Sequence, residues 1–426
     1  MTDANKVSDA LSSKEEGRGK SARFVGRAFR SRNYRLYFVG QGVSLIGTWM
    51  QNIALSWLVY NLTQSAFMLG VVGFISQFPM MLLTPVAGVL ADRWNRYRMM
   101  IVNQMAMMVL ALILAVLVLG HWVTMWQIIV IGLCFGAANA MDAPTRHSFI
   151  TELVETREDL PNAIALNSAM FNSARLIGPS LAGLLIAWTG EGVCFLLNAI
   201  SFLAVIFALL AMNMPSQPQR VETGQGGIFK ALKDGFYYTF GSKDLRYIIL
   251  HFGFVSLFGM SYIVLLPILA KEILKGGARN LGFLMGAMGI GALLSSFMMA
   301  VKKDNHDLWK LTARASALFG LGLIALSQSR HFGLSFLAMI LAGFGMVTIM
   351  TASNTYLQTN IEDDKRARVM AFYLLAFFGT VPLGNLATGS IANIIGVPTA
   401  LFLAGLFSLL ASGIFTFKFS RYLRKN

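Results

Sequence analysis

The strongest constraint on this chain is a succession of apolar runs, each about as long as a helix that crosses a bilayer. Residues 66–91 form one such run and residues 99–120 form another. The segment that joins them, Gly88 to Arg98, reads G-V-L-A-D-R-W-N-R-Y-R and is rich in charge. About 20 apolar residues are enough for a helix to span the hydrocarbon core. The two runs are therefore predicted to cross a membrane in opposite directions, with a charged hairpin at its surface.

The composition excludes a water-soluble globular protein. Hydrophobic residues make up 56% of the chain and charged residues only 13%, whereas soluble proteins carry about 25% charged residues. The pattern instead predicts an all-α membrane protein with twelve transmembrane helices. The predicted spans are residues 34–60, 66–91, 99–120, 124–144, 162–188, 192–212, 245–270, 280–301, 309–328, 332–356, 367–392 and 397–418.

The distribution of charge orients these spans. A net charge of +15 would by itself suit a nucleic-acid partner. In the predicted topology, however, 30 of the 35 Lys and Arg residues lie on one side of the membrane. Basic residues in short loops mark the cytoplasmic side. Both termini are therefore predicted to be cytoplasmic, and no nucleic-acid partner is expected.

The predicted spans fall into two similar halves. Several residues recur at nearly constant offsets along the chain. The offset is 211 positions for Ser31 and Ser242, 212 for Gly70 and Gly282, and 206 for Gly183 and Gly389. Nearly equal offsets predict two pseudo-symmetric six-helix bundles, at residues 33–212 and 244–418. Parallel repeats of this size place a substrate site at their interface, near the bilayer midplane.

The remaining segments are predicted to lie on the cytoplasmic side. Residues 1–32 and 419–426 are predicted tails, and the first of these is expected to be disordered. It either sets the topology or binds anionic lipid headgroups. Residues 213–243 form a linker in which apolar residues recur at helical spacing. The linker is therefore predicted to contain an amphipathic helix that lies on the membrane surface.

Polar residues inside the spans are candidates for binding, because lipid offers them no partners. In the first span, Gln41, Thr48 and Asn52 share one face. Such a face contacts either a neighbouring helix or an aqueous cavity, and the two long amides favour the cavity. The tenth span has a similar face. The candidates there are Thr351, Asn354 and Gln358.

The fifth span carries Arg175 close to its midpoint, on the same face as Asn172. An arginine at that depth costs at least about 2.5 kcal/mol, so it must face a partner, backbone carbonyls or water. A binding role is favoured over a structural one. A permanently charged, planar guanidinium is suited to a carboxylate or another oxyanion.

Two titratable residues in the predicted spans are candidates for proton coupling. Asp142 lies one turn inside the cytoplasmic end of the fourth span, where it pairs with Arg146 or takes part in coupling. His251 in the seventh span is either a packing residue or a proton carrier.

The charged hairpin resembles the loop between helices 2 and 3 of the major facilitator superfamily, whose pattern is roughly G-x-x-x-D-R-x-G-R-R. Asn95 and Tyr97 depart from that pattern. Further segments resemble the exporter branch that contains enterobactin-type siderophore exporters and macrolide efflux proteins. They are A-P-T-R-H-S from Ala143, N-A-I-A-L-N-S from Asn162, R-L-I-G-P from Arg175 and R-V-M-A-F-Y from Arg368.

The resemblance implies a bacterial inner-membrane exporter that works by alternating access and is driven by protons. A monomer that contacts membrane lipid is expected, with no cofactor and no bound metal. Asp92 and Arg93 are predicted to act in gating together with Arg96. A carboxylate is favoured at a helix N-terminus, so Asp92 is predicted to meet the start of the eleventh span, near Arg366 and Arg368.

The residues favour an anionic, polar substrate, and within this family the best prediction is a siderophore. Multidrug or macrolide efflux and a lysophospholipid flippase remain alternatives. A membrane enzyme is not favoured, since the sequence shows no His cluster, no paired intramembrane carboxylates and no cysteine ligand set. No G-x-x-x-x-G-K-[ST] motif is present for binding ATP.

Overall fold

The computed structural model of the chain describes residues 26–93, 95–154, 156–213, 228–302 and 307–423, and all regular structure within these ranges is helical. The first half contains η1 (Arg27–Arg30), α2 (Arg32–Thr63), α3 (Ala66–Arg93), α4 (Arg96–Leu119), α5 (Met125–Leu153), η2 (Arg157–Asp159), α6 (Leu160–Thr189) and α7 (Glu191–Leu210). Next come α8 (Ile228–Gly241), α9 (Lys243–Phe258), η3 (Met260–Leu265), α10 (Leu266–Ile268) and η4 (Leu269–Ile273). The chain ends with α11 (Gly277–Val301), α12 (Leu308–Gln328), α13 (Phe332–Asn360), α14 (Asp363–Phe378), α15 (Thr380–Ile395) and α16 (Val397–Leu423).

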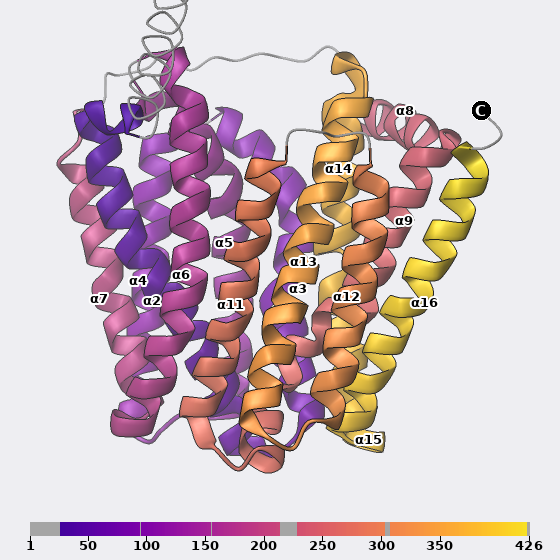
Figure 1. Ribbon diagram of the computed structural model, residues 1–426. Helices are drawn as coiled ribbons and strands as arrows, with labels where there is room; N and C mark the ends of the chain where they lie inside the picture. Colours follow the sequence, from indigo (N-terminus) through magenta and orange to yellow (C-terminus); the bar gives the residue numbers. More distant parts are fainter. Residues whose placement is uncertain (1–25, 94, 155, 214–227, 303–306, 424–426) are drawn as a thin grey trace, which may run out of the picture.

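The predicted fold of twelve membrane helices is confirmed. Eleven described segments are long and apolar enough to cross a membrane. The twelfth is α2, which has 32 residues but a more polar composition. The long helices run side by side, with the start of α2 and the end of α16 at one end of the bundle (Figure 1). We call this the terminal end, because α2 begins and α16 ends there, and we call the other the opposite end.

Several helices differ from their predicted bounds. The seventh span is interrupted, since α9 ends before Gly259 and is followed by η3, α10 and the π-helical η4. The eleventh is divided at Gly379 into α14 and α15. The fourth continues through Pro144 as far as Leu153. Hydropathy marks only the part of a helix that lies in lipid, so it does not locate polar ends that extend into water.

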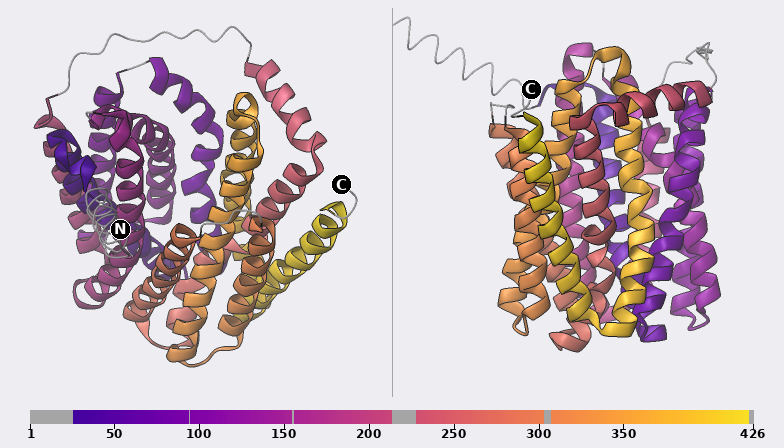
Figure 2. Two further views of the ribbon diagram at one scale, coloured as in Figure 1. Left: turned by 45° about the horizontal axis from the view of Figure 1, so that its top comes forward. Right: turned by 90° about the vertical axis from the view of Figure 1, so that its right-hand side faces the viewer.

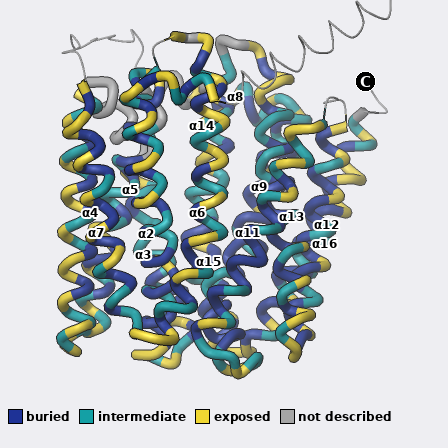
Figure 3. Tube along the Cα trace, turned by 60° about the vertical axis from the view of Figure 1, so that its left-hand side comes forward, coloured by how far each residue is buried: buried dark blue, intermediate teal, exposed yellow. Residues whose placement is uncertain are grey.

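The helices pack as two groups that meet along two seams (Figure 2). Within the groups, α2 packs on α6 and α7, and α12 packs on α13 and α16. Between them, α3 packs on α15, and α6 packs on α11. Many residues of α4 and α7, at the edge of the bundle, are exposed (Figure 3). Trp122, Trp126 and Trp188, which are 65–75% exposed, lie at the opposite end, as interfacial tryptophans commonly do.

Glycines bring the seams together near the opposite end. A Cβ at Gly70 of α3 would lie 2.7 Å from the backbone oxygen of Asn385 in α15. The other seam is alike, because a Cβ at Gly282 of α11 would lie 2.6 Å from the backbone oxygen of Pro179 in α6. Only glycine allows backbones to approach so closely. The two halves are therefore in backbone contact at the opposite end.

The linker helix α8 lies at the terminal end against α9 and α14 (Figure 2). Phe236 and Phe240 of α8 both contact the ring of Phe372 in α14. The ammonium group of Lys365 lies 4.8 Å from the centre of the Tyr238 ring. These contacts attach the connection between the halves to the start of α14.

Candidate functional site

A cavity of about 450 Å³ lies between the two halves. Its walls come from α2, α3, α4, α5, α6 and α7 of the first half and from η3, α10, α11, α13, α14 and α15 of the second. Cavities of about 300–1,000 Å³ with mostly apolar walls and a few polar groups are typical of small-molecule sites. The cavity is the candidate binding site.

Arg175 is the charged residue in this lining. Its guanidinium carbon lies 5.1 Å from the centre of the Trp49 ring and 5.8 Å from that of Phe171. Its Nε is buried without a hydrogen-bond partner. Among the residues that the structure describes, no Asp or Glu lines the cavity. Aromatic faces hold the cation in place but leave its hydrogen-bond donors for a ligand.

The local sequence explains how Trp49 reaches Arg175. Gly178 follows Arg175 by one turn of α6, and a Cβ there would lie 2.6 Å from Cβ of Trp49. The glycine therefore lets α2 and α6 approach closely. Trp49 also lines the cavity.

The structure brings together only part of the predicted binding set. Thr48 and Asn52 line the cavity with Arg175. Five predicted residues do not line the cavity: Gln41, Asn172, Thr351, Asn354 and Gln358. Gln41 is buried in α2, and its Oε1 has no hydrogen-bond partner. Gln358 donates to Asn354 on α13, toward the terminal end.

Gln51, which lies one step round α2 from the predicted polar face, also lines the cavity. Other polar lining residues were not predicted, and they are Ser56, Ser76, Gln77, Asn139 and Asn385. The pair Ser76–Gln77 had a signal in the sequence, since two adjacent polar residues interrupt a long apolar run. Asn385 had no such signal, because its role depends on the other half. Its amide donates to the carbonyl of Gly73 across the seam, at 3.3 Å.

The predicted gating residues lie at the terminal end, but only some can be described. The side chains of Asp92 and Arg93 lie outside the described residues, as does their predicted contact with α14. Arg96 forms an ion pair with Glu152 of α5, with a nitrogen–oxygen distance of 3.0 Å. Arg366 donates to the carbonyl oxygen of Ile361 at 3.4 Å, while Arg368 is exposed beside Gly235 of α8.

The two predicted proton-coupling residues are buried in different places. Asp142 accepts hydrogen bonds from Gln104, at 2.9 Å, and Asn103, at 3.4 Å, and lies 3.6 Å from Arg146. These contacts tie α5 to α4. His251 shares a hydrogen bond of 2.7 Å with Ser316 of α12 and stacks on Phe415 of α16. Neither residue lines the cavity.

A polar cluster links the halves at the opposite end, and we call it the latch: Tyr60, Asn61, Lys271 and Glu272. The Lys271 ammonium donates to Asn61 at 2.9 Å and lies over the ring of Tyr60. The Tyr60 hydroxyl donates to Glu272 at 3.3 Å. The π-helical turn η4 places adjacent Lys271 and Glu272 against the end of α2. The latch was missed because its partners are 210 or more positions apart.

Two repeated six-helix bundles that meet at one end around a mostly apolar cavity with a few polar groups are the arrangement of transporters of the major facilitator superfamily. The chain belongs within it to the family described as transmembrane secretion effector, which matches residues 27–424. The predicted resemblance to an exporter branch of the superfamily is thereby confirmed.

Curated relatives span almost the whole chain. It is 23% identical to the staphyloferrin A transporter of Staphylococcus aureus, over 90% of this chain and 95% of that one. It is 20% identical to macrolide efflux protein A of Streptococcus pyogenes, with coverages of 88% and 93%. For the enterobactin exporter EntS of Shigella flexneri the identity is 22%, with coverages of 89% and 90%.

Solved structures support the fold. A bacterial homolog of the human lysosomal transporter Spinster, in an inward-facing and occupied conformation, superposes with a TM-score of 0.72 at 13% identity. The match covers 92% of this chain and 98% of that one. At this identity the likeness concerns the fold alone.

Proposed function

We propose that this protein exports a small anionic metabolite from the bacterial cytoplasm by alternating access, and that the metabolite is a siderophore. The observation that carries the proposal is Arg175, a cation in the cavity wall that lies over the rings of Trp49 and Phe171. A cation with a buried Nε and no Asp or Glu in the described lining is costly, so a bound oxyanion would be favoured there.

The neutral polar groups in the lining support the same conclusion. Thr48 and Asn52 of α2 and Gln77 of α3 line the cavity with Arg175. Hydroxyl and amide groups serve as donors and acceptors for the hydroxyls and amides of a polar metabolite. A lipophilic cation would instead call for a carboxylate in the wall, and none lines the cavity in the described part of the chain.

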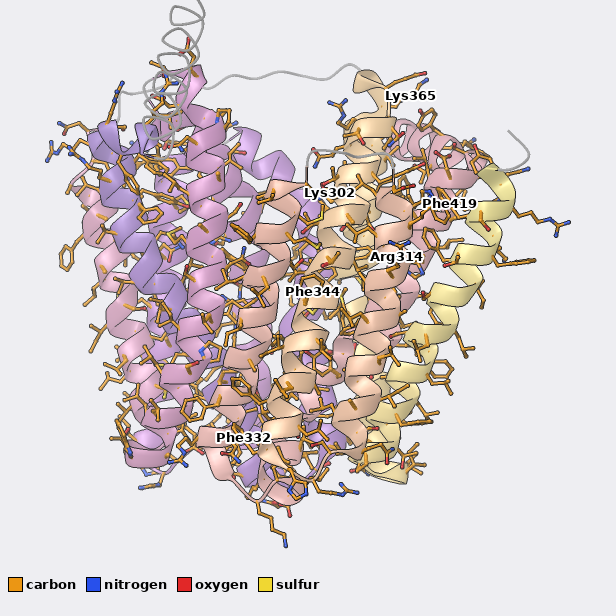
Figure 4. The ribbon with its side chains drawn as sticks, in the orientation of Figure 1. Lys302, Arg314, Phe332, Phe344, Lys365 and Phe419 are labelled. Carbon is orange, nitrogen blue, oxygen red and sulfur yellow. The ribbon has the colours of Figure 1, made fainter. Side chains whose placement is uncertain are left out.

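The orientation proposed is that the terminal end faces the cytoplasm. Lys302 and Lys365 lie at this end of the second half, whereas Phe332 lies at the other (Figure 4). Excess Lys and Arg on one side marks the cytoplasm. Because the glycine seams are closed at the opposite end, this structure would admit substrate from the cytoplasm and correspond to an inward-open state.

A siderophore is the preferred metabolite because two of the relatives carry siderophore names. We propose that protons drive the export, that Asp142 or His251 carries them, and that the protein acts as a monomer. A further group of residues would close the terminal end during the transport cycle: Asp92, Arg93, Arg96, Arg366 and Arg368.

Drug efflux is the second candidate, and the methionines in the cavity wall favour it. Met80, Met107, Met260, Met285, Met288 and Met346 line the cavity. Methionine side chains are flexible and polarisable, and they adapt to ligands of different shape. Macrolide efflux protein A is also among the relatives.

The experiment compares a strain that lacks the gene with strains that express the wild type, Arg175→Gln or Arg175→Lys at equal protein levels. Under iron limitation, the deletion is expected to remove iron-chelating activity from the medium and to accumulate it in cells. Arg175→Gln is expected to lower the secreted chelating activity at least tenfold. Arg175→Lys keeps the charge, so its secretion is expected to fall less. Unchanged chelator secretion together with raised macrolide sensitivity would overturn the siderophore proposal.

A further inference from the structure

We infer that the substrate is an anion that carries an apolar arm, and that the two halves of the transporter divide its recognition. The first half holds the anionic group and the second half holds the apolar arm. This inference rests on the proposed function, because it deepens the assignment of the Arg175 site.

The repeat shows the division at corresponding positions. With the offset of 211 positions, Asn52 of α2 corresponds to Ile263 of η3, and Ser56 corresponds to Pro267 of α10. All four residues line the cavity. At both positions the first half presents a polar side chain and the second half presents an apolar one.

The helices that form the two seams show the same division. With the offset of 206, Arg175 of α6 corresponds to Val381 of α15, while Phe171 corresponds to Phe377. With the offset of 212, Ser76 of α3 corresponds to Met288 of α11. All of these residues also line the cavity. The aromatic ring of Phe171 is matched by another ring in the second half. The charged Arg175 and the hydroxyl of Ser76 are instead matched by the apolar side chains of a valine and a methionine.

The second half offers a ligand almost no hydrogen bonds. Asn385 is its one polar residue in the lining, among the residues that the structure describes. Its amide already donates to the carbonyl of Gly73. The other lining residues of the second half include Met260, Met285, Met288 and Met346, which we call the methionine wall. Arg175 comes from the first half.

A two-sided cavity selects its ligand by chemistry. A polycarboxylate without apolar groups would lose hydration against the methionine wall and gain nothing there. A lipophilic cation would be repelled by Arg175. A carboxylate or another oxyanion with one alkyl or aryl arm satisfies both walls, since the arm gains the free energy of apolar burial.

The test measures binding to the purified full-length protein by calorimetry, with protein-free micelles as the blank. The probes are hexanoate, octanoate, decanoate, citrate and decyltrimethylammonium. We expect affinity to rise about tenfold for each two-carbon extension of the carboxylate. Citrate and the cation are expected to bind at least tenfold more weakly than decanoate.

Matched variants locate the apolar wall. The double variant M285Q and M288Q is expected to cut the gain for each extension to about threefold or less. The double variant M285L and M288L keeps the wall apolar and is expected to preserve the gain. An unchanged gain in the glutamine variant, with the same elution on size exclusion as the wild type, would overturn the division between the halves.

The outcomes separate this inference from the proposed function. If citrate binds as tightly as decanoate and Arg175→Gln weakens both, the anion site stands but the apolar arm is wrong. If Arg175→Gln weakens neither, the proposed anion site itself fails.

A competition experiment identifies the source of the anion. Displacement of decanoate by N-lauroylglycine but not by lauroyl-lysophosphatidylglycerol assigns the site to a free carboxylate. The reverse assigns it to a membrane lipid. Displacement by either supports the apolar arm, and displacement by neither overturns it.

Discussion

The two ends of the interface between the halves differ in how they are held. At the opposite end, pairs such as Gly70 with Gly389 bring backbones into direct contact. At the terminal end, the described ion pair of Arg96 with Glu152 joins helices of the first half only. Backbone contact depends on shape, whereas ion pairs respond to charge and protonation. We propose that backbone packing, together with the latch, closes the opposite end and that charge regulates the terminal end.

The largest effect should come from filling a glycine seam. A Cβ at Gly389 would lie 2.6 Å from the backbone oxygen of Ala66, so Gly389→Leu should prevent closure of the opposite end. Overpacking of this kind costs about 1–3 kcal/mol, and we expect export to fall at least tenfold. Labelling of cysteines placed on both sides of the seam should show increased access from outside.

The matched control is Gly413→Leu in α16, where a Cβ would meet nothing within 4 Å. This variant should transport like the wild type. Normal export by Gly389→Leu would show that the seam is not part of the transport cycle.

Replacing the two buried titratable residues, Asp142 and His251, should show whether protonation drives transport. If protons drive export, at least one of Asp142→Asn and His251→Gln should lower accumulation driven by a pH gradient about tenfold or more. Exchange of substrate without a gradient should continue, because neither residue lines the cavity. If both variants and their combination keep pH-driven transport, the coupling site lies elsewhere or the driving ion is not a proton.

The latch should have a smaller effect. Lys271→Met removes the hydrogen bond to Asn61 and the contact with the Tyr60 ring. Together these contribute about 1 kcal/mol, so the outward-open population should rise about fivefold. Spin-label distances between α2 and α11 at the opposite end would measure that shift. Arg330→Met, also at the opposite end, is the control, and equal distances in both variants would exclude a role for the latch.

The sequence was sufficient to predict the fold but only part of the site. Long apolar runs and a repeat near half the chain length were visible along the sequence, because spanning a bilayer imposes a length on each helix. Arg175 was predicted as a candidate because a charge in an apolar run is costly wherever the helix packs. These signals are local to one span.

The residues that the sequence did not predict depend on contacts between spans. The role of Trp49 beside Arg175 requires Gly178 on another helix to make room for it. Lys271, which donates to Asn61, lies in the π-helical turn that ends the interrupted seventh span. Thr351 and Gln358 were predicted to share a polar face toward the site, but among the described residues of α13 only Met346 lines the cavity. These contacts depend on how the helices are positioned relative to one another. The sequence of a single apolar span does not determine that position.

The central claim is that Arg175 binds an anion that this protein moves out of the cytoplasm. The most direct measurement is uptake of radiolabelled chelator, purified from the spent medium of the wild-type strain, into energised inverted membrane vesicles. Vesicles with the wild-type protein should accumulate the chelator, and a protonophore should abolish the accumulation. Vesicles with equal amounts of the Arg175→Gln protein should accumulate at least tenfold less. Equal accumulation by the two proteins would contradict the claim.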